Sequence, residues 1–219
     1  MDRLSSLNKL IQIPLVIILV FPSYSCRTKD LVKDNTLYEM KSFTLDQTSD
    51  KGEKLFNLKS PKAFIDNVDK IINTNKTDIT LFELDQPTYK IDADKSKIKM
   101  KGDHIILNGN VVMKKLKQQK IRVTADQVDW YSETSFIKFS GNVTGEFKNS
   151  TIKSKEANYY LDKQELHFED LTDFFVIDQE RKRKYFKVEA KKALWDGNSG
   201  IFEFLNNGES INSKVLIKN

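Results

Sequence analysis

A short pattern that recurs five times constrains this chain more than any other feature. Each copy has an aliphatic residue, a small residue two positions later, a usually apolar residue three positions after that, and a bulky apolar residue after two more. The copies begin at Leu58, Ile91, Val123, Ile152 and Val188, at intervals of 33, 32, 29 and 36 residues. Self-similarity at such a period indicates one supersecondary unit stacked on itself. We therefore expect a repetitive, elongated fold.

Within each copy, both halves of the pattern alternate with the period of a β-strand, so their apolar side chains share one face. The three-residue step between the halves breaks that period, and a β-bulge there would turn the strand. Gly109-Asn110-Val111 and Gly141-Asn142-Val143 also repeat, and a glycine inside a strand marks a bulge or a close backbone approach. We predict an all-β fold: one sheet bent along its length into an elongated, V-shaped roll with an apolar interior. The small residues expected at the corners are Ser60, Ala93, Ala125, Ser154 and Ala190.

The remainder of the chain fits long strands. All four prolines lie within the first 87 residues, so the later strands can form uninterrupted ladders. Asp50-Lys51-Gly52 has the composition of a turn. Residues 66–83 are ambiguous, because Asn73–Asp78 is polar and turn-prone, and we interpret them as a strand, a long loop and a strand. No long helix is expected after residue 25.

The N-terminus has the composition of an export signal. Arg3 and Lys9 precede the apolar run Ile11–Phe21, which is too short for the roughly 20 residues of a membrane-spanning helix. We predict three parts: a signal peptide or membrane anchor at 1–25, a polar tether at 26–37, and a β domain at 38–219.

Cys26 is the chain's single cysteine and follows the small Ser25, as at the acylation site of bacterial lipoproteins. Ser23 and Tyr24 fit that motif poorly. Three alternatives stay open: lipidation of Cys26, an uncleaved anchor at 10–25, and a plain cleaved signal. All three place the domain outside the cytoplasm.

Charge and motifs limit the function classes. The net charge of +5 is spread along the chain except for the run Arg181–Lys184, which we interpret as a solvated turn, with lipid phosphates or an acidic membrane surface as the alternative partner. Nucleic acid is not expected, because no recognition motif accompanies the run. His104 and His167 have no metal-ligand neighbours at usable spacing, and no nucleotide, nucleophile or cofactor motif occurs. We expect a non-enzymatic protein without cofactor or metal.

The residues resemble the LptC family, the membrane-tethered periplasmic component of lipopolysaccharide export. The likeness is strongest over 104–170, in HIILNGNVVM, IRVTADQVDWY, FIKFSGNVTGEF and IKSKEANYYLDKQELHF, and extends loosely from Phe43 to Phe204. The related LptA shares the same β-jelly roll, known as the OstA/LptA-like fold. A short, lipoprotein-like signal departs from the single spanning helix typical of LptC.

The resemblance implies a relay at the inner membrane. An ABC transporter, with LptF/LptG-like subunits and an LptB-like ATPase, would pass lipopolysaccharide to this domain, which would pass it to an LptA-like bridge protein. Strand addition at the sheet edges would join the proteins. The receiving edge would lie near 38–46, and the donating edge near 211–218, where Ile211, Val215 and Ile217 share a face.

Inward-facing apolar residues of the repeats are the candidates for lipid contact. Filling the protein's own core is the alternative role for each of them. A carrier of another glycolipid or phospholipid, or a β-rich structural envelope lipoprotein, would use the same pattern. The candidate lining residues are Val123, Ala125, Val128, Trp130, Ile137, Phe139, Val143, Ile152, Tyr159, Phe168, Trp195 and Phe204.

Overall fold

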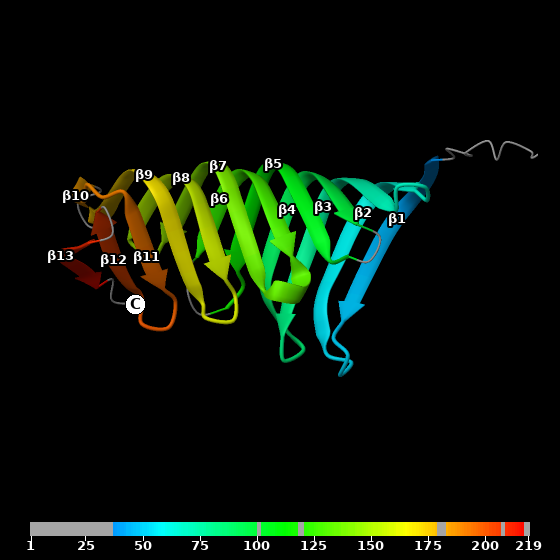
Figure 1. Cartoon of the computed structure of the whole chain (residues 1–219), viewed down its shortest axis with the longest axis horizontal. Helices are drawn as coiled ribbons and strands as arrows, with labels where there is room; N and C mark the ends of the chain where they lie inside the picture. Colours follow the sequence, from blue (N-terminus) through cyan, green and yellow to red (C-terminus); the bar gives the residue numbers. More distant parts are fainter. Residues whose placement is uncertain (1–36, 100–101, 118–120, 179–182, 207–208, 217–219) are drawn as a thin grey trace, which may run out of the picture. The chain divides into compact units, whose positions relative to one another are not determined.

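A computed structural model describes residues 37–99, 102–117, 121–178, 183–206 and 209–216 (Figure 1). The predicted signal or anchor, and Cys26, lie outside these residues. The strands are β1 (Leu37–Thr48), β2 (Lys54–Asp66), β3 (Ile71–Glu83), β4 (Gln86–Lys99), β5 (His104–Lys115), β6 (Arg122–Tyr131), β7 (Phe136–Phe147), β8 (Ser150–Tyr160), β9 (Glu165–Asp178), β10 (Arg183–Lys187), β11 (Lys192–Asp196), β12 (Ile201–Asn206) and β13 (Glu209–Leu216). A 3₁₀ turn, η1 (Ser132–Thr134), is the sole helical element in the described ranges.

All strands belong to one antiparallel sheet in which each strand pairs with the next along the chain, from β1 to β9 and then through β11 and β12 to β13. The exception is β10, which pairs with the C-terminal end of β9, while β11 pairs with its N-terminal end. The first half of the fifth copy, Val188 and Ala190, therefore lies in the connection between β10 and β11, and its second half, Ala193 and Trp195, lies in β11. The predicted all-β, V-shaped roll is confirmed.

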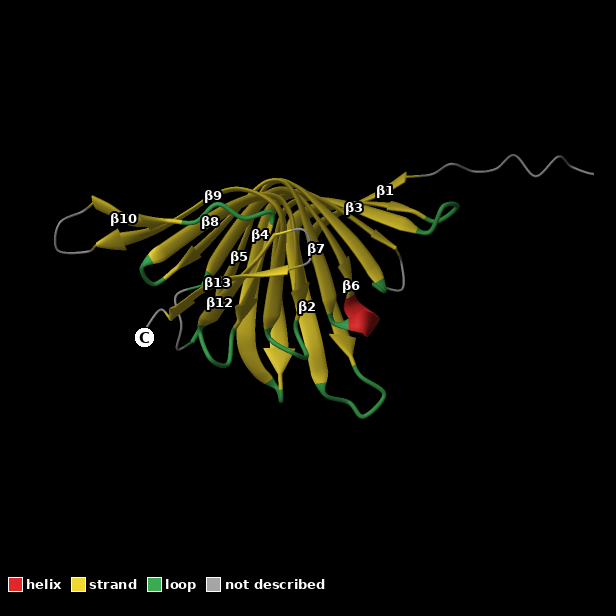
Figure 2. Ribbon diagram, turned by 60° about the vertical axis from the view of Figure 1, so that its left-hand side comes forward, coloured by secondary structure: helices red, strands yellow, loops and turns green. Residues whose placement is uncertain are grey.

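The sheet bends along a line that crosses the middle of the long strands. Residues with a positive φ lie on this line in the odd-numbered strands: Ser42, Lys76, Asn110, Asn142 and Asp170, joined by Gly109 and Gly141. The register shifts at the same places in the β4–β5, β5–β6, β6–β7 and β7–β8 pairs. Figure 2 shows the strands curving over this bend into two arms. The predicted corner at the three-residue step is therefore present.

Side chains reinforce the bend in two ways. Where the repeat has serine at the corner, its hydroxyl bonds the backbone across the bulge: Ser60 Oγ donates to Lys62 O and Ser154 Oγ to Glu156 O, each at 2.8 Å. In the β6–β7 copy of the Gly-Asn corner, Asn142 Nδ2 donates to Asp126 Oδ2 on the neighbouring strand at 2.7 Å. The β4–β5 corner repeats this bond from Asn110 to Asp94.

The two arms pack against each other with a diagonal offset. One arm contains the strand halves next to residues 84–85 and 116–117, and the other contains the strand halves next to 102–103, 132–135 and 161–164. Phe56 of β2 contacts Trp130 of β6 at 4.8 Å between ring centroids. Four strand spacings amount to about 19 Å in a flat sheet. Contact over that separation therefore requires the sheet to be folded on itself.

Two local expectations were wrong. Residues 71–83 form one continuous strand, joined to β2 by the four-residue turn 67–70, so no long loop occurs there. The polar residues between 73 and 78 lie at the bend, where buried Thr74 shares hydroxyl hydrogen bonds with Thr77 and Ser96. Arg183 and Lys184, expected in a turn, begin β10, while Arg181 and Lys182 lie outside the described residues.

The bend predicts an unequal response to alanine at two glycines that both have a positive φ. A Cβ at Gly141 would lie 2.6 Å from Asp126 Oδ2, whereas Gly52 has open space around it. Gly52→Ala should lose about 1–2 kcal/mol of unfolding free energy from the left-handed backbone alone. Gly141→Ala should lose at least about 1 kcal/mol more, because the displaced Asp126 also loses its bond to Asn142. Urea unfolding of both variants measures the difference, and equal losses would contradict the role of this corner.

Candidate functional site: an apolar inner face with a lateral cavity

An unbroken apolar row runs along the inner face of the arm that contains η1. Its members are directly opposed partners on successive strands, which places their side chains on one face. The row crosses eleven strands, from β1 through β9, β11 and β12. The members are Tyr38, Ile65, Ile72, Ile98, Ile105, Trp130, Ile137, Tyr159, Leu166, Trp195 and Phe202.

A second row of the same arm, nearer the bend, alternates large and small residues over its C-terminal half. Phe139, Ala157, Phe168, Ala193 and Phe204 oppose one another in that order. Such alternation lets facing layers interdigitate. Gly145, on the facing arm, lies against Phe168. A Cβ at Gly145 would lie 2.9 Å from the Phe168 ring, so the absence of a side chain there makes room for Phe168.

The structure places all twelve predicted lining residues in this interior. Each is a buried member of a single apolar core, from both arms and the bend. They pack within this core, as in the ring contact of Trp195 with Phe147, whose centroids lie 4.8 Å apart. Their contact with lipid stays a prediction.

A pair of tyrosines joins the two arms. The hydroxyls of Tyr89 on β4 and Tyr159 on β8 lie 2.6 Å apart, and both side chains are buried. Burial raises the pKa of Tyr89 to about 12, although the hydrogen bond to Tyr159 opposes this. Burial, the Tyr89 hydroxyl and the Glu83 carboxylate raise the pKa of Tyr159. The pair therefore stays neutral and hydrogen-bonded throughout the physiological range.

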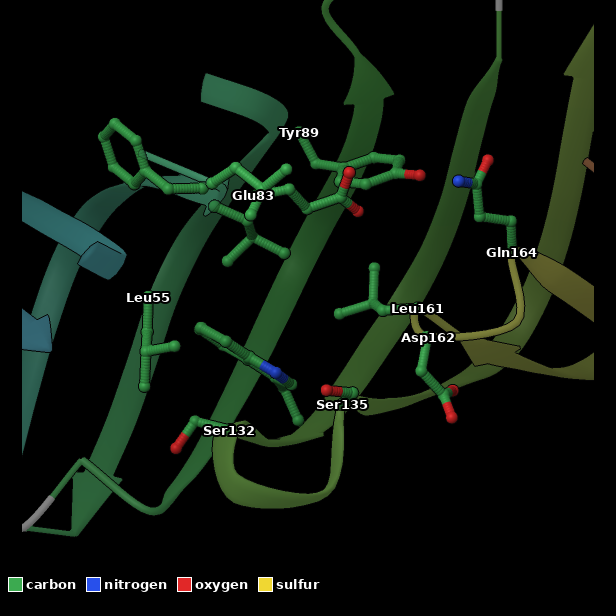
Figure 3. Close-up of a pocket in the computed structure, with 12 residues that line it drawn as sticks. Leu55, Glu83, Tyr89, Ser132, Ser135, Leu161, Asp162 and Gln164 are labelled. Atoms are coloured by element: carbon green, nitrogen blue, oxygen red, sulfur yellow. The ribbon is translucent and has the colours of Figure 1, made fainter. Parts of the chain in front are cut away.

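A lateral cavity of about 370 Å³ opens between the arms beside this pair (Figure 3). Leu55, Glu83 and Tyr89 on one arm face Ser132, Ser135 and Leu161 on the other. The volume falls within the roughly 300–1,000 Å³ range of ligand pockets. The remaining lining residues are Leu81, Phe82, Leu84, Trp130, Asp162 and Gln164.

Sequence reasoning identified Trp130 but missed the rest of this cavity. Half of its lining residues lie in turns or in η1, and a periodic pattern does not show which turns meet across a folded sheet. One signal was available in the sequence. The turn between β3 and β4 holds Leu84, an apolar residue where glycine or asparagine is usual.

The predicted partner edges are the two ends of the strand order, β1 and β13. On β1 the inner row ends at Tyr38, which retains 53% of its accessible surface, and Met40, two residues further along the same face, retains 42%. On β13, Ile211 and Val215 belong to the strand, and Ile217 lies outside the described residues. Binding of partners at these edges stays a prediction.

Each of the two histidines lies beside a carboxylate. His104 pairs with Asp129 at 3.2 Å and stacks on Tyr131, and His167 pairs with Glu165 at 3.1 Å. In the part of the chain that the structure describes, no cluster of three or more potential metal ligands occurs. Within the same ranges, no helix has the length and apolar character needed to cross a membrane.

Comparison with protein families decides the relationship. The family model "Lipopolysaccharide-assembly, LptC-related" matches residues 10–173, about three quarters of the chain. The chain belongs to the LptC family. The match covers β1 to β8 in full and ends within β9, before the fifth copy of the repeat.

A search of solved structures finds LptH of Pseudomonas aeruginosa, described as the LptA-homologous periplasmic component of the lipopolysaccharide transport device. The identity is 10% and the TM-score 0.46, over 56% of this chain and 86% of LptH. A search of curated protein sequences found no match to the chain.

The tyrosine pair makes alkaline stability a test of the contact between the arms. Because both pKa values are raised in the folded state, the contribution is complete below pH 10 and is lost as the pH rises through about 12. A shift of two pKa units corresponds to at most about 2.7 kcal/mol. Replacing both tyrosines by phenylalanine should flatten stability between pH 10 and 12, measured by urea unfolding.

The single variants and a matched control separate the hydrogen bond from bulk alkaline effects. Tyr159→Phe should cost about 1–3 kcal/mol at pH 7, because it leaves the buried Tyr89 hydroxyl unpaired. Exposed Tyr131→Phe should follow the unmodified protein at every pH. A double variant with the same alkaline loss as the unmodified protein would rule out the pair as its cause.

Proposed function

We propose that this chain binds lipopolysaccharide acyl chains on its apolar inner face and relays them from an inner-membrane ABC transporter to a periplasmic LptA-like bridge protein. Membership of the LptC family supports a role in lipopolysaccharide transport. The observation that carries the relay is the inner row, which offers apolar side chains on every strand from β1 to β9. Tethering by the N-terminal segment or by lipidated Cys26 is part of the proposal.

The physical need for such a row follows from the cost of exposing lipid. Each CH₂ group is worth roughly 0.8 kcal/mol, so an acyl chain of about 12 carbons costs on the order of 10 kcal/mol in water. A continuous apolar lining removes most of that barrier. Transfer between two similar linings is nearly neutral, so direction must come from ATP hydrolysed by the transporter. The chain itself acts as a conduit and not as an enzyme.

Lipid contact with the inner row requires the arms to separate. Ile137 of the inner row and Phe139 of the second row are both fully buried against other side chains of the protein. An acyl chain would replace the contacts between arms with contacts to itself, exchanging one apolar environment for another. The tightly filled core is also the observation that favours the alternative of a structural envelope lipoprotein. A carrier of another glycolipid or a phospholipid would bind through the same rows.

Photo-crosslinking in cells tests whether lipid follows the inner face. A photoreactive residue at Phe139 should form adducts with lipopolysaccharide, and the adducts should disappear when the transporter's ATPase is disabled. The matched control is the neighbouring Lys138, whose side chain is paired with Glu156 on the outer face at 2.9 Å. Phospholipid adducts at Phe139 would favour the other-carrier function. A folded protein without adducts at either position would favour the structural lipoprotein.

The exposed end of the inner row predicts where the transporter docks. Tyr38→Ser with Met40→Ser should reduce copurification of the LptF/LptG-like subunits by at least about tenfold, because both apolar side chains would be buried by an added strand. Leu37→Ser is the control, since Leu37 is 61% exposed and lies on the opposite face of β1. Stability should change little in both, because none of the three side chains is buried. Equal copurification of the two variants would contradict docking at this edge.

A further inference from the structure

Leu84 stands out at the rim of the lateral cavity because its position carries two costs. It is 86% exposed, and its φ of +49° lies in the left-handed region that disfavours residues with a Cβ. It occupies a tight turn in which asparagine or glycine would avoid both costs. Leu84 nevertheless lines the cavity together with Leu55 and Leu161. An apolar ligand that covers Leu84 would explain its presence.

Trp130 supplies an independent indication of a ligand on the cavity wall. Its side chain is 97% buried, and its indole Nε1 has no hydrogen-bond partner among the described residues. Indole nitrogen can only donate a hydrogen bond, and a buried donor left without an acceptor is destabilising. Because Trp130 lines the cavity, a ligand that brings an acceptor into it could satisfy this group.

The charges around the cavity select the kind of acceptor. Glu83 and Asp162 are exposed carboxylates that line it. No lysine or arginine is among the described residues that line it, although Lys115 Nζ lies 5.9 Å from the centre of the Tyr89 ring and Lys54 Nζ lies 5.8 Å from the centre of the Phe82 ring. Two carboxylates oppose an anionic head group, while neutral donors such as Ser135 suit carbonyl and hydroxyl oxygens.

We propose that the lateral cavity binds a lipid through the uncharged ester or amide linkage at the start of its acyl chain. The carbonyl of that linkage accepts a hydrogen bond from Trp130 Nε1, and the acyl chain packs against Leu84, Leu161 and Leu55. Phosphate groups of the same lipid stay outside the acidic rim. The site would hold a lipid from the side, between the arms, and would meet the inner row at Trp130. This inference rests on the proposed lipid-binding function and adds a chemical class and a location to it.

Indole NMR of the full-length protein tests the site, because the chain has just two tryptophans. With ¹⁵N-labelled tryptophan, titration with 1-monolauroylglycerol below its micelle concentration should move the indole N–H resonance of Trp130 downfield in a saturable manner. Trp195, outside the cavity lining, is the internal reference and should not move. Dodecyl phosphate is the anionic comparison probe and should bind at least about tenfold more weakly, since the carboxylates oppose it.

Leu84→Asn separates the ligand site from the fold. Asparagine tolerates the left-handed turn better than leucine, so stability should be unchanged or higher, while 1-monolauroylglycerol should bind about tenfold more weakly. Leu116→Asn is the matched control, because Leu116 is 45% exposed beside the next turn of the same arm but does not line the cavity. Its binding should equal that of the unmodified protein.

Three results would overturn the inference: a Trp130 resonance that does not move, equal binding of dodecyl phosphate, or equal effects of the two asparagine variants. The crosslinking experiment at Phe139 distinguishes these failures from failure of the relay. Lipopolysaccharide adducts at Phe139 combined with an unmoved Trp130 resonance would retain the relay and reject the lateral site. A moved Trp130 resonance without adducts at Phe139 would do the reverse.

Discussion

The bend across the strands is the constraint on which the rest of this structure depends. A twisted antiparallel sheet of this width has two faces, and a chain with one apolar residue in two can cover one of them only by folding the sheet onto itself. The left-handed residues at the bend, including the Gly-Asn corners, provide that fold in every second strand from β1 to β9. Without them, the inner rows would face water.

The diagonal offset between the arms gives the two ends of the roll different properties. Because the arms meet four strands out of step, as in the contact of Phe56 with Trp130, the arm that carries the inner row extends past its partner at β1. The row ends there on exposed Tyr38, while its interior members such as Ile98 are fully buried. An apolar surface that is covered within the molecule and uncovered at one end is suited to continuation by another protein.

The sequence predicted the strands, the bend and the inward-facing residues because all three follow from periodicity along the chain. It did not predict the continuity of β3, because Asn73–Asp78 reads as a turn until Thr74 is seen to find hydroxyl partners on its own and the neighbouring strand. The sequence also did not predict the Tyr89–Tyr159 contact or the lateral cavity. Both depend on the offset between the arms, which no short stretch of sequence encodes.

The contacts between the arms reconcile a filled interior with a carrier. Along most of the roll, the facing arms are joined by apolar and aromatic contacts, which are non-directional and which an acyl chain can replace at little net cost. The Tyr89–Tyr159 bond is different, because separating the arms there would leave two buried hydroxyls without partners unless water or a polar ligand group reached them. The lateral cavity lies beside this pair and brings carbonyl, hydroxyl and carboxylate groups close to it. The hydrogen bond that joins the arms therefore lies at the cavity through which polar groups can enter. Such groups could replace the bond there, which gives the arms a physical reason to open at this point first.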